Sequence, residues 1–155
     1  MADWLMKTEP DVFSIDILQR KGVEHWDGVR NFQARNHMRA MKLGDRVLFY
    51  HSSCDPPGVA GLARVCREAY PDFTSWDPSS KYYDPRSTAE NDRWSMVDVE
   101  FVEKFGRLVP LDEMRRTKGL EDMLLLRRGM RLSVQPVTAA HFQRICKLGR
   151  GKAPA

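Results

Sequence analysis

The alternation of apolar and polar residues predicts that the middle of the chain is mostly β-structure. Residues 94–105 alternate most clearly, with Val97, Val99 and Phe101 directed inward and acidic residues between them directed outward. Residues 46–52 are apolar on both faces, which is typical of a strand that is covered on both sides. Further strands are expected at 3–7, 59–68 and 131–137.

Helical spacing and capping residues predict helices on either side of this β-region. Ser14 caps a short helix that runs through Gln19, and a second helix is expected over 29–41, with Gly44 in a left-handed conformation after it. Later helices are expected at 111–116, 120–126 and 139–148. Together these elements predict an α+β fold, a small mixed β-barrel of about five strands with helices inserted early and late.

A long segment between Tyr70 and Trp94 has no regular period. It contains Trp76, Tyr82 and Tyr83 together with two Asp-Pro pairs. Ordered loops of this length are uncommon in compact domains and are usually functional. We therefore expect the aromatic residues of 70–93 to anchor the segment.

Composition indicates one small globular domain. The chain has 155 residues, a mass of 17.9 kDa and 42% hydrophobic residues. We expect a domain over 1–150 and a disordered tail over 151–155. No apolar run approaches the ~20 residues of a membrane span, and no secretory signal is evident. Three cysteines, an odd count, indicate free thiols and a cytoplasmic location.

The charge is mildly basic and unevenly distributed. Residues 1–100 carry 13 Lys and Arg against 16 Asp and Glu, whereas residues 101–155 carry 12 against 5. Such an asymmetry suits a polyanionic partner that approaches from one side.

The sequence contains no motif that calls for catalysis or a metal. Ser52 and Ser53 adjoin His51, but adjacent strand residues point to opposite faces, so they do not form a nucleophile–base pair. His51 and Cys54 have ligand-like spacing, yet a tetrahedral site needs a second pair. We predict no catalytic residue, no metal and no cofactor.

The residues WDGVRN at 26–31 form the most suggestive cluster. They place Trp26 and several polar groups at the start of a helix, where backbone N–H groups are free. An aromatic face beside hydrogen-bond donors suits an unpaired nucleobase. Trp26 as a core residue and Asp27 as a helix cap is the alternative. The basic stripe of Arg35, Arg39 and Lys42 also has two interpretations: such a stripe is more often a solvated helix face than a phosphate track.

Several longer motifs resemble the EVE-domain family. They are WLMKTEP at 4–10, WDGVRNFQARNHMRAMKLGD at 26–45, FYHSSCDPPGVAG at 49–61, AYPD at 69–72, YYDPRS at 82–87 and LLLRRGMRLSVQPV at 124–137. The resemblance covers about residues 3–147 in the order and spacing of the family.

The resemblance implies a PUA-like fold, a closed mixed barrel of about five to six strands with helices over its openings. It also implies a non-catalytic pocket for a modified base, most often modified cytosine in DNA and alternatively modified RNA. The implied pocket residues are Trp4, Lys7, Thr8, Trp26, Val29, Arg30, Asn31, Ser52, Ser53 and Trp94. Phosphate contacts are expected from Lys7, Arg30 and the stripe of Arg35, Arg39 and Lys42.

Two positions depart from the family pattern. Thr8 stands where serine is commoner, which keeps the hydroxyl, and Ser53 stands where asparagine is usual, which removes an amide. Two other functions stay open: an enzyme acting on a nucleobase or nucleoside through Lys7, and a structural adaptor with a vestigial pocket. We expect a monomer that binds nucleic acid and does not associate with membranes.

Overall fold

The computed structural model describes residues 1–151, in which six strands form one sheet. The strands are β1 (Asp3–Thr8), β2 (Val23–His25), β3 (Arg46–His51), β4 (Gly58–Pro71), β5 (Ser95–Pro110) and β6 (Val134–Val137). The helices are α1 (Ile15–Lys21), α2 (Phe32–Ala40), α3 (Leu111–Arg115) and α4 (Ala139–Arg150), with 3-10 turns η1 (Phe73–Trp76) and η2 (Leu124–Leu126). The expected tail, 151–155, lies outside the described residues except for Gly151.

The sheet is mixed, as expected, but it is open. Its strand order is β2-β5-β4-β3-β1-β6, with β1 parallel to β3 and the other pairs antiparallel. The α+β class and the six strands are therefore confirmed, whereas the closed barrel is wrong. Both edges are short, and Pro136 in β6 has no N–H to donate to a further strand, so no ladder joins β2 to β6 within residues 1–151.

Both faces of the central strands are buried, as the apolar run at 46–52 predicts. On β3, Val47 and Phe49 belong to one core cluster, while Leu48 and Tyr50 belong to the other. Helices α1 and α2 contribute to the first cluster, and α3 and α4 contribute to the second. The alternation of side chains along a strand thus divides the core into two layers.

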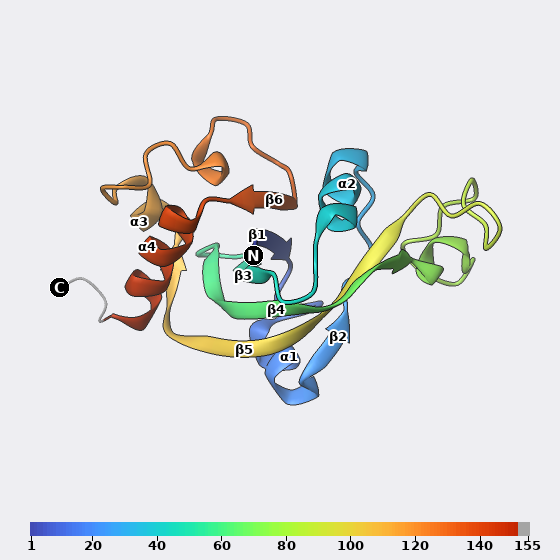
Figure 1. Cartoon of the computed structure of the whole chain (residues 1–155), viewed down its shortest axis with the longest axis horizontal. Coiled ribbons are helices and arrows are strands. Elements are labelled where there is room, and N and C mark those ends of the chain that lie inside the picture. Colours follow the sequence, from blue (N-terminus) through green and yellow to red (C-terminus); the bar gives the residue numbers. More distant parts are fainter. Residues whose placement is uncertain (152–155) are drawn as a thin grey trace.

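Strands β4 and β5 extend beyond the other strands and form a long, bent pair. Their pairing shifts register at four places, and such bulges bend a strand pair. The pair carries the segment between Pro71 and Ser95 to one end of the molecule (Figure 1). Residues 59–68 and 94–105 were therefore predicted as strands with bounds that are too short.

Other predictions also differ from the structure, among them the strand expected over 131–137, of which only Val134–Val137 pairs, as β6. The helix expected over 29–41 begins at Phe32, because Asn31 takes an extended conformation and its Oδ1 accepts a hydrogen bond from the Ala34 N–H at 2.9 Å. The helix expected over 120–126 is only the turn η2, with Leu120 and Leu125 buried as anchors. Strand β2 has three residues and was missed.

Among residues 1–151, no helix is both long and apolar enough to cross a lipid bilayer. The three cysteines are unpaired, as the sequence predicts.

Candidate functional site

A cavity of about 590 Å³ lies where the end of β1 meets five loop segments. It is lined by Lys7, Thr8, Glu9, Val12, Trp26, Asp27, Gly28, Val29, Arg30, Ser52, Ser53, Lys81, Tyr82, Met130, Arg131 and Ser133. A smaller cavity of about 170 Å³ adjoins it and shares Thr8, Val12, Trp26, Asp27 and Tyr82. Two aromatic residues from distant parts of the chain, Trp26 and Tyr82, therefore line both cavities.

The ring of Tyr82 packs directly against Gly28. Gly28 has a φ of +83°, and a Cβ at this position would lie 2.7 Å from the nearest ring atoms. A residue with a side chain would meet both backbone strain and this collision. Gly28 is therefore required for the position of the Tyr82 ring.

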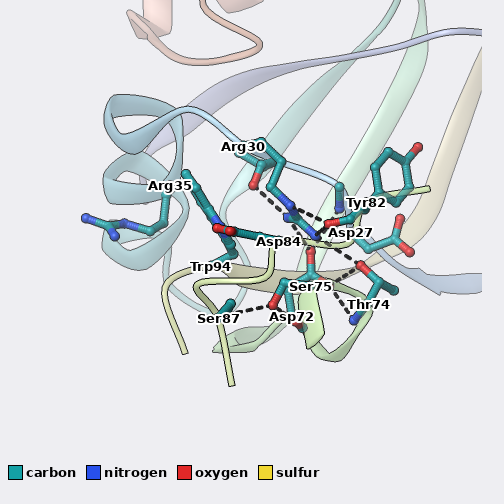
Figure 2. Close-up of polar contacts among 12 residues, drawn as sticks. Asp27, Arg30, Arg35, Asp72, Thr74, Ser75, Tyr82, Asp84, Ser87 and Trp94 are labelled. Carbon is teal, nitrogen blue, oxygen red and sulfur yellow. Dashed lines mark hydrogen bonds and ion pairs between the residues drawn. The ribbon is translucent and has the colours of Figure 1, made fainter. Parts of the chain in front are cut away.

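The buried carboxylate of Asp72 joins this region to the long loop. Asp72 is 0% exposed. Its Oδ2 accepts from the Gly28 N–H and from Arg30 Nη1, both at 2.9 Å, and its Oδ1 accepts from the N–H and hydroxyl of Thr74. Figure 2 shows Arg30 and Thr74 directed toward Asp72. A buried carboxylate is stable only with such a set of donors.

Arg30 holds the loop in place with all of its donors. Its guanidinium makes five hydrogen bonds: two to the Tyr82 carbonyl, one each to the Val29 carbonyl, to Asp72 and to the Thr74 hydroxyl. A guanidinium has five N–H groups, so every donor is used inside the protein. Arg30 lines the cavity, but it has no N–H left for an incoming phosphate unless one of these bonds breaks.

Two charged groups face the cavity with few partners. Among residues 1–151, the one side chain paired with the Asp27 carboxylate is His25, whose Nε2 lies 3.5 Å from Asp27 Oδ2. Burial raises the pKa of the Asp27 carboxyl, the charges of Asp72 and Glu24 raise it further, and His25 opposes them. Lys7 is half-buried, its Nζ lies 5.6 Å from the Tyr50 ring centroid, and burial lowers the pKa of its amine. The cavity thus offers an acceptor and a cationic donor.

The structure brings seven of the ten predicted pocket residues together at the larger cavity: Lys7, Thr8, Trp26, Val29, Arg30, Ser52 and Ser53. Trp26 is also a core residue, as the alternative for it proposed, since it is 5% exposed and packs edge-on against Phe13 and Phe49. Ser53 reaches the cavity from a left-handed backbone with a φ of 54°.

Trp4 lies far from the cavity wall, although it shares a strand with Lys7 and Thr8. Its Nε1 donates to Asp45 Oδ2 at 3.0 Å, and it packs against His37. Four residues of strand span about 13 Å, so Trp4 and Thr8 occupy opposite ends of β1.

Asn31 and Trp94 also lie off the wall of the larger cavity. Asn31 caps α2 and faces a neighbouring cavity of about 270 Å³. Trp94 stacks on Phe32 with centroids 4.8 Å apart, and its Nε1 donates to Asp84 Oδ2 at 2.7 Å. Arg30 lies 5.6 Å from the Trp94 ring centroid, so Trp94 supports Arg30 instead of lining the cavity.

Of the predicted basic stripe, Arg35 and Arg39 lie on α2 and are committed to internal contacts, whereas Lys42 lies beyond the end of the helix at Ala40. Arg35 donates to the Arg93 carbonyl and to Asn36, and in Figure 2 its side chain points away from the Arg30–Asp72 group. Arg39 donates to Ser95 Oγ at 2.9 Å. Lys42, the third member, is exposed.

Sequence reasoning missed Asp27 and Tyr82 as cavity residues, and Asp72 as their support. The motifs AYPD and YYDPRS contained the signal, because they place Asp72 and Tyr82 in the long aromatic loop. The contact between Tyr82 and Gly28 joins positions 54 residues apart, and no local pattern reveals it. Within residues 1–151, no group of three or more His, Cys, Asp or Glu side chains is placed to hold a metal.

Comparison with known proteins assigns a family to this chain. The family model described as "EVE domain" matches residues 2–148. Human thymocyte nuclear protein 1 is 46% identical over 166 residues, which cover 95% of this chain and 73% of that protein. A crystal structure of a Pseudomonas syringae protein is 49% identical, covers 96% of this chain and 99% of its own, and has a TM-score of 0.93.

One similar structure contains nucleic acid. It is human THYN1 protein in complex with DNA that contains 5-methylcytosine. That protein is 42% identical to this chain, with 99% of this chain and 100% of the other covered and a TM-score of 0.92.

Replacing Gly28 tests whether this residue positions Tyr82. We expect Gly28→Ala to lower the free energy of unfolding by about 2 kcal/mol through the left-handed backbone, and the collision with Tyr82 adds to this loss. Gly22→Ala is the matched control, since Gly22 has a φ of +80° but no atom within 4 Å of its Cβ position. Urea unfolding of both variants measures the difference; equal losses would contradict the packing role.

Replacing Asp72 tests the buried carboxylate. We expect Asp72→Asn to lower the free energy of unfolding by about 3 kcal/mol, because the amide leaves Arg30 without its buried counter-charge. Asp77→Asn, an exposed change in the same loop, should leave the unfolding midpoint unchanged. Should Asp72→Asn fail to fold, Thr74→Val removes one donor and should cost about 1 kcal/mol. A stability equal to that of the wild type in both variants would disprove this role.

Proposed function

This chain belongs to the EVE-domain family, and from that membership we propose that it binds DNA and holds a modified cytosine between Trp26 and Tyr82 without catalysing a reaction. The supporting observation is the cavity of about 590 Å³ that Trp26 and Tyr82 line. The 5-methylcytosine DNA bound by its human relative supports the choice of base.

The dimensions and aromatic walls of the cavity suit a flat base. A volume of about 590 Å³ falls within the range of ligand-binding clefts. Stacking on an aromatic ring contributes ~1–3 kcal/mol per base, which offsets the few kcal/mol needed to extract the base from a duplex. Tyr82 is the more exposed of the two rings, and its contact with Gly28 sets its plane before any ligand arrives.

The presence of Asp27 in the cavity supports cytosine as the bound base. Cytosine carries an amino group on its exposed edge, and a carboxylate oxygen accepts from it. The ring nitrogen beside the amino group is an acceptor, so a two-bond contact with Asp27 requires one shared proton. Burial raises the pKa of Asp27, which favours the proton on this carboxyl. Lys7 offers a cationic donor at the same cavity.

Several expectations remain predictions. They are binding of modified RNA, the monomeric state, the cytoplasmic location and the absence of catalysis. The enzyme alternative depends on Lys7, whose amine has a pKa lowered by burial and therefore loses its proton more readily than an exposed lysine.

Removing the Tyr82 ring tests the stacking role. We expect Tyr82→Ala to weaken binding of a 5-methylcytosine oligonucleotide by about 5- to 150-fold, the equivalent of 1–3 kcal/mol. Tyr83→Ala is the control, because Tyr83 is the neighbouring exposed ring and does not line the cavity. Fluorescence anisotropy with labelled oligonucleotides measures both affinities.

The same titration includes matched oligonucleotides with unmodified cytosine and with 5-methylcytosine in RNA. Equal wild-type affinity for modified and unmodified DNA would contradict the modified-base proposal, and tighter binding of the RNA would contradict DNA as the partner. Mass spectrometry of the oligonucleotide after incubation should find it unchanged; turnover that is lost in Lys7→Ala would establish the enzyme alternative.

Changing Asp27 tests the base contact through its pH dependence. Because the protonated carboxyl makes both bonds, affinity for the 5-methylcytosine oligonucleotide should rise as the pH falls toward the raised pKa of Asp27. Asp27→Asn, whose amide offers one donor and one acceptor, should bind with little dependence on pH. Asp27→Ala should weaken binding about tenfold or more.

Affinities measured between about pH 5 and pH 8 compare these variants with His25→Gln, since His25 Nε2 lies 3.5 Å from Asp27 Oδ2. A pH dependence that survives Asp27→Asn and disappears in His25→Gln would assign the effect to His25 and overturn the role of Asp27.

A further inference from the structure

Residues 127–131, with the sequence RRGMR, place three arginines at the rim of the cavity. Arg127, Arg128 and Arg131 are exposed. Within the part of the chain that the structure describes, their side chains make no ion pair within 4.0 Å and no hydrogen bond. Arg131 itself lines the larger cavity. Three guanidinium groups are therefore available beside the proposed base site.

A tight turn fixes the arrangement of these arginines. The Met130 N–H donates to the Arg127 carbonyl at 3.1 Å, and Gly129 has a φ of +76°, the features of a turn with glycine at its third position. Arg128 thus lies at the tip of the turn. Met130 lines both the larger cavity and the neighbouring one of about 270 Å³, so its side chain anchors the turn to the site.

The turn lies next to the start of α2. Asn31 and Gln33 share the neighbouring cavity with Met130 and Arg131. Figure 1 shows the segment before β6, in orange, crossing the top of the view and ending near α2. Two acidic residues, Glu9 and Asp27, line the larger cavity together with Arg131. Asp122 Oδ1 lies 2.9 Å from His141 Nε2, and Asp122 forms no ion pair with Arg127 among the described residues.

The other arginines near this cavity are more committed to contacts within the protein. Arg30 uses all five donors within the protein. Arg35 stacks on Phe32 at 4.7 Å and donates to a backbone carbonyl, and Arg39 donates to Ser95. New contacts from these residues require existing ones to break. The three arginines of the turn have no such cost in the described structure.

We propose that residues 127–131 form the phosphate-binding turn that holds the DNA backbone beside the base in the cavity. This inference rests on the proposed function, because it assumes that a nucleic-acid strand enters the site. The Cα atoms at the two ends of such a turn lie within about 7 Å of each other. One DNA strand presents a phosphate about every 3.4 Å along the helix axis, so the turn spans about two phosphates. A guanidinium group binds a phosphate through two parallel N–H···O hydrogen bonds. Such contacts add affinity that does not depend on the base sequence.

A triple substitution tests the turn. Arg127→Gln, Arg128→Gln and Arg131→Gln together should weaken binding of a 5-methylcytosine oligonucleotide about tenfold or more, and should reduce the slope of log K against log salt concentration by about 2. The ratio of affinities for modified and unmodified DNA should stay the same, because phosphate contacts are common to both. Anisotropy titrations at four salt concentrations measure affinity and slope.

The control is a second triple, Arg116→Gln, Lys118→Gln and Lys147→Gln, which removes the same charge from exposed positions that do not line the cavity. It should change the slope by less than half as much. Equal losses in the two triples would show general attraction and overturn the inference, as would an unchanged slope in the first triple. A wild-type protein that binds no DNA would instead overturn the proposed function itself.

Discussion

The buried carboxylate of Asp72 is the interaction on which the site depends. A carboxylate without exposure needs several donors, and here they come from residues on two separate segments, 28–30 and 74. The donors on 28–30 are the Gly28 N–H and the Arg30 guanidinium. The hydrogen bonds that they make to Asp72 therefore also hold the long loop against the segment that precedes α2. The position of Tyr82 follows, since Arg30 binds the Tyr82 carbonyl and Gly28 contacts the Tyr82 ring. One polar group at the end of β4 thus determines where an aromatic wall stands.

The sheet supplies the frame for this arrangement. Strands β1 and β3 are covered on both faces, which fixes Lys7 and Thr8 at the end of β1. The long pair of β4 and β5 carries the loop out of the core and returns it at Ser95. The stack of Phe32 on Trp94 then joins the base of the loop to α2. Rigid elements therefore meet at the cavity from several directions, as precise recognition requires.

Features of the fold and the site that depend on residues close in sequence could be predicted, whereas features that depend on contacts between distant residues could not. The double-sided strand at 46–52, the Ser14 cap and most helices depend on residues close in sequence, and the structure has them. The start of α2 and the turn η2 were misjudged because capping by Asn31 and burial of single leucines override helical spacing. Trp4 and Trp94 have the right residue type for a pocket, yet the bonds of their indole N–H groups to Asp45 and Asp84 place them elsewhere. Tyr82 reaches the cavity only through contacts of more than 40 residues in sequence separation, which no local pattern contains.

The internal use of every Arg30 donor has a thermodynamic consequence for the arrival of a ligand. A loop that is ordered only on binding costs conformational entropy at that moment, and this cost weakens the complex. Here the ordering of the segment from Asp72 to Tyr82 belongs to folding, since Arg30 and Asp72 hold it through hydrogen bonds within the protein. The interaction energy of an incoming base is then not used to order the cavity, so it contributes to the difference in affinity between one base and another. The same rigid cavity adapts less readily to ligands of other shapes.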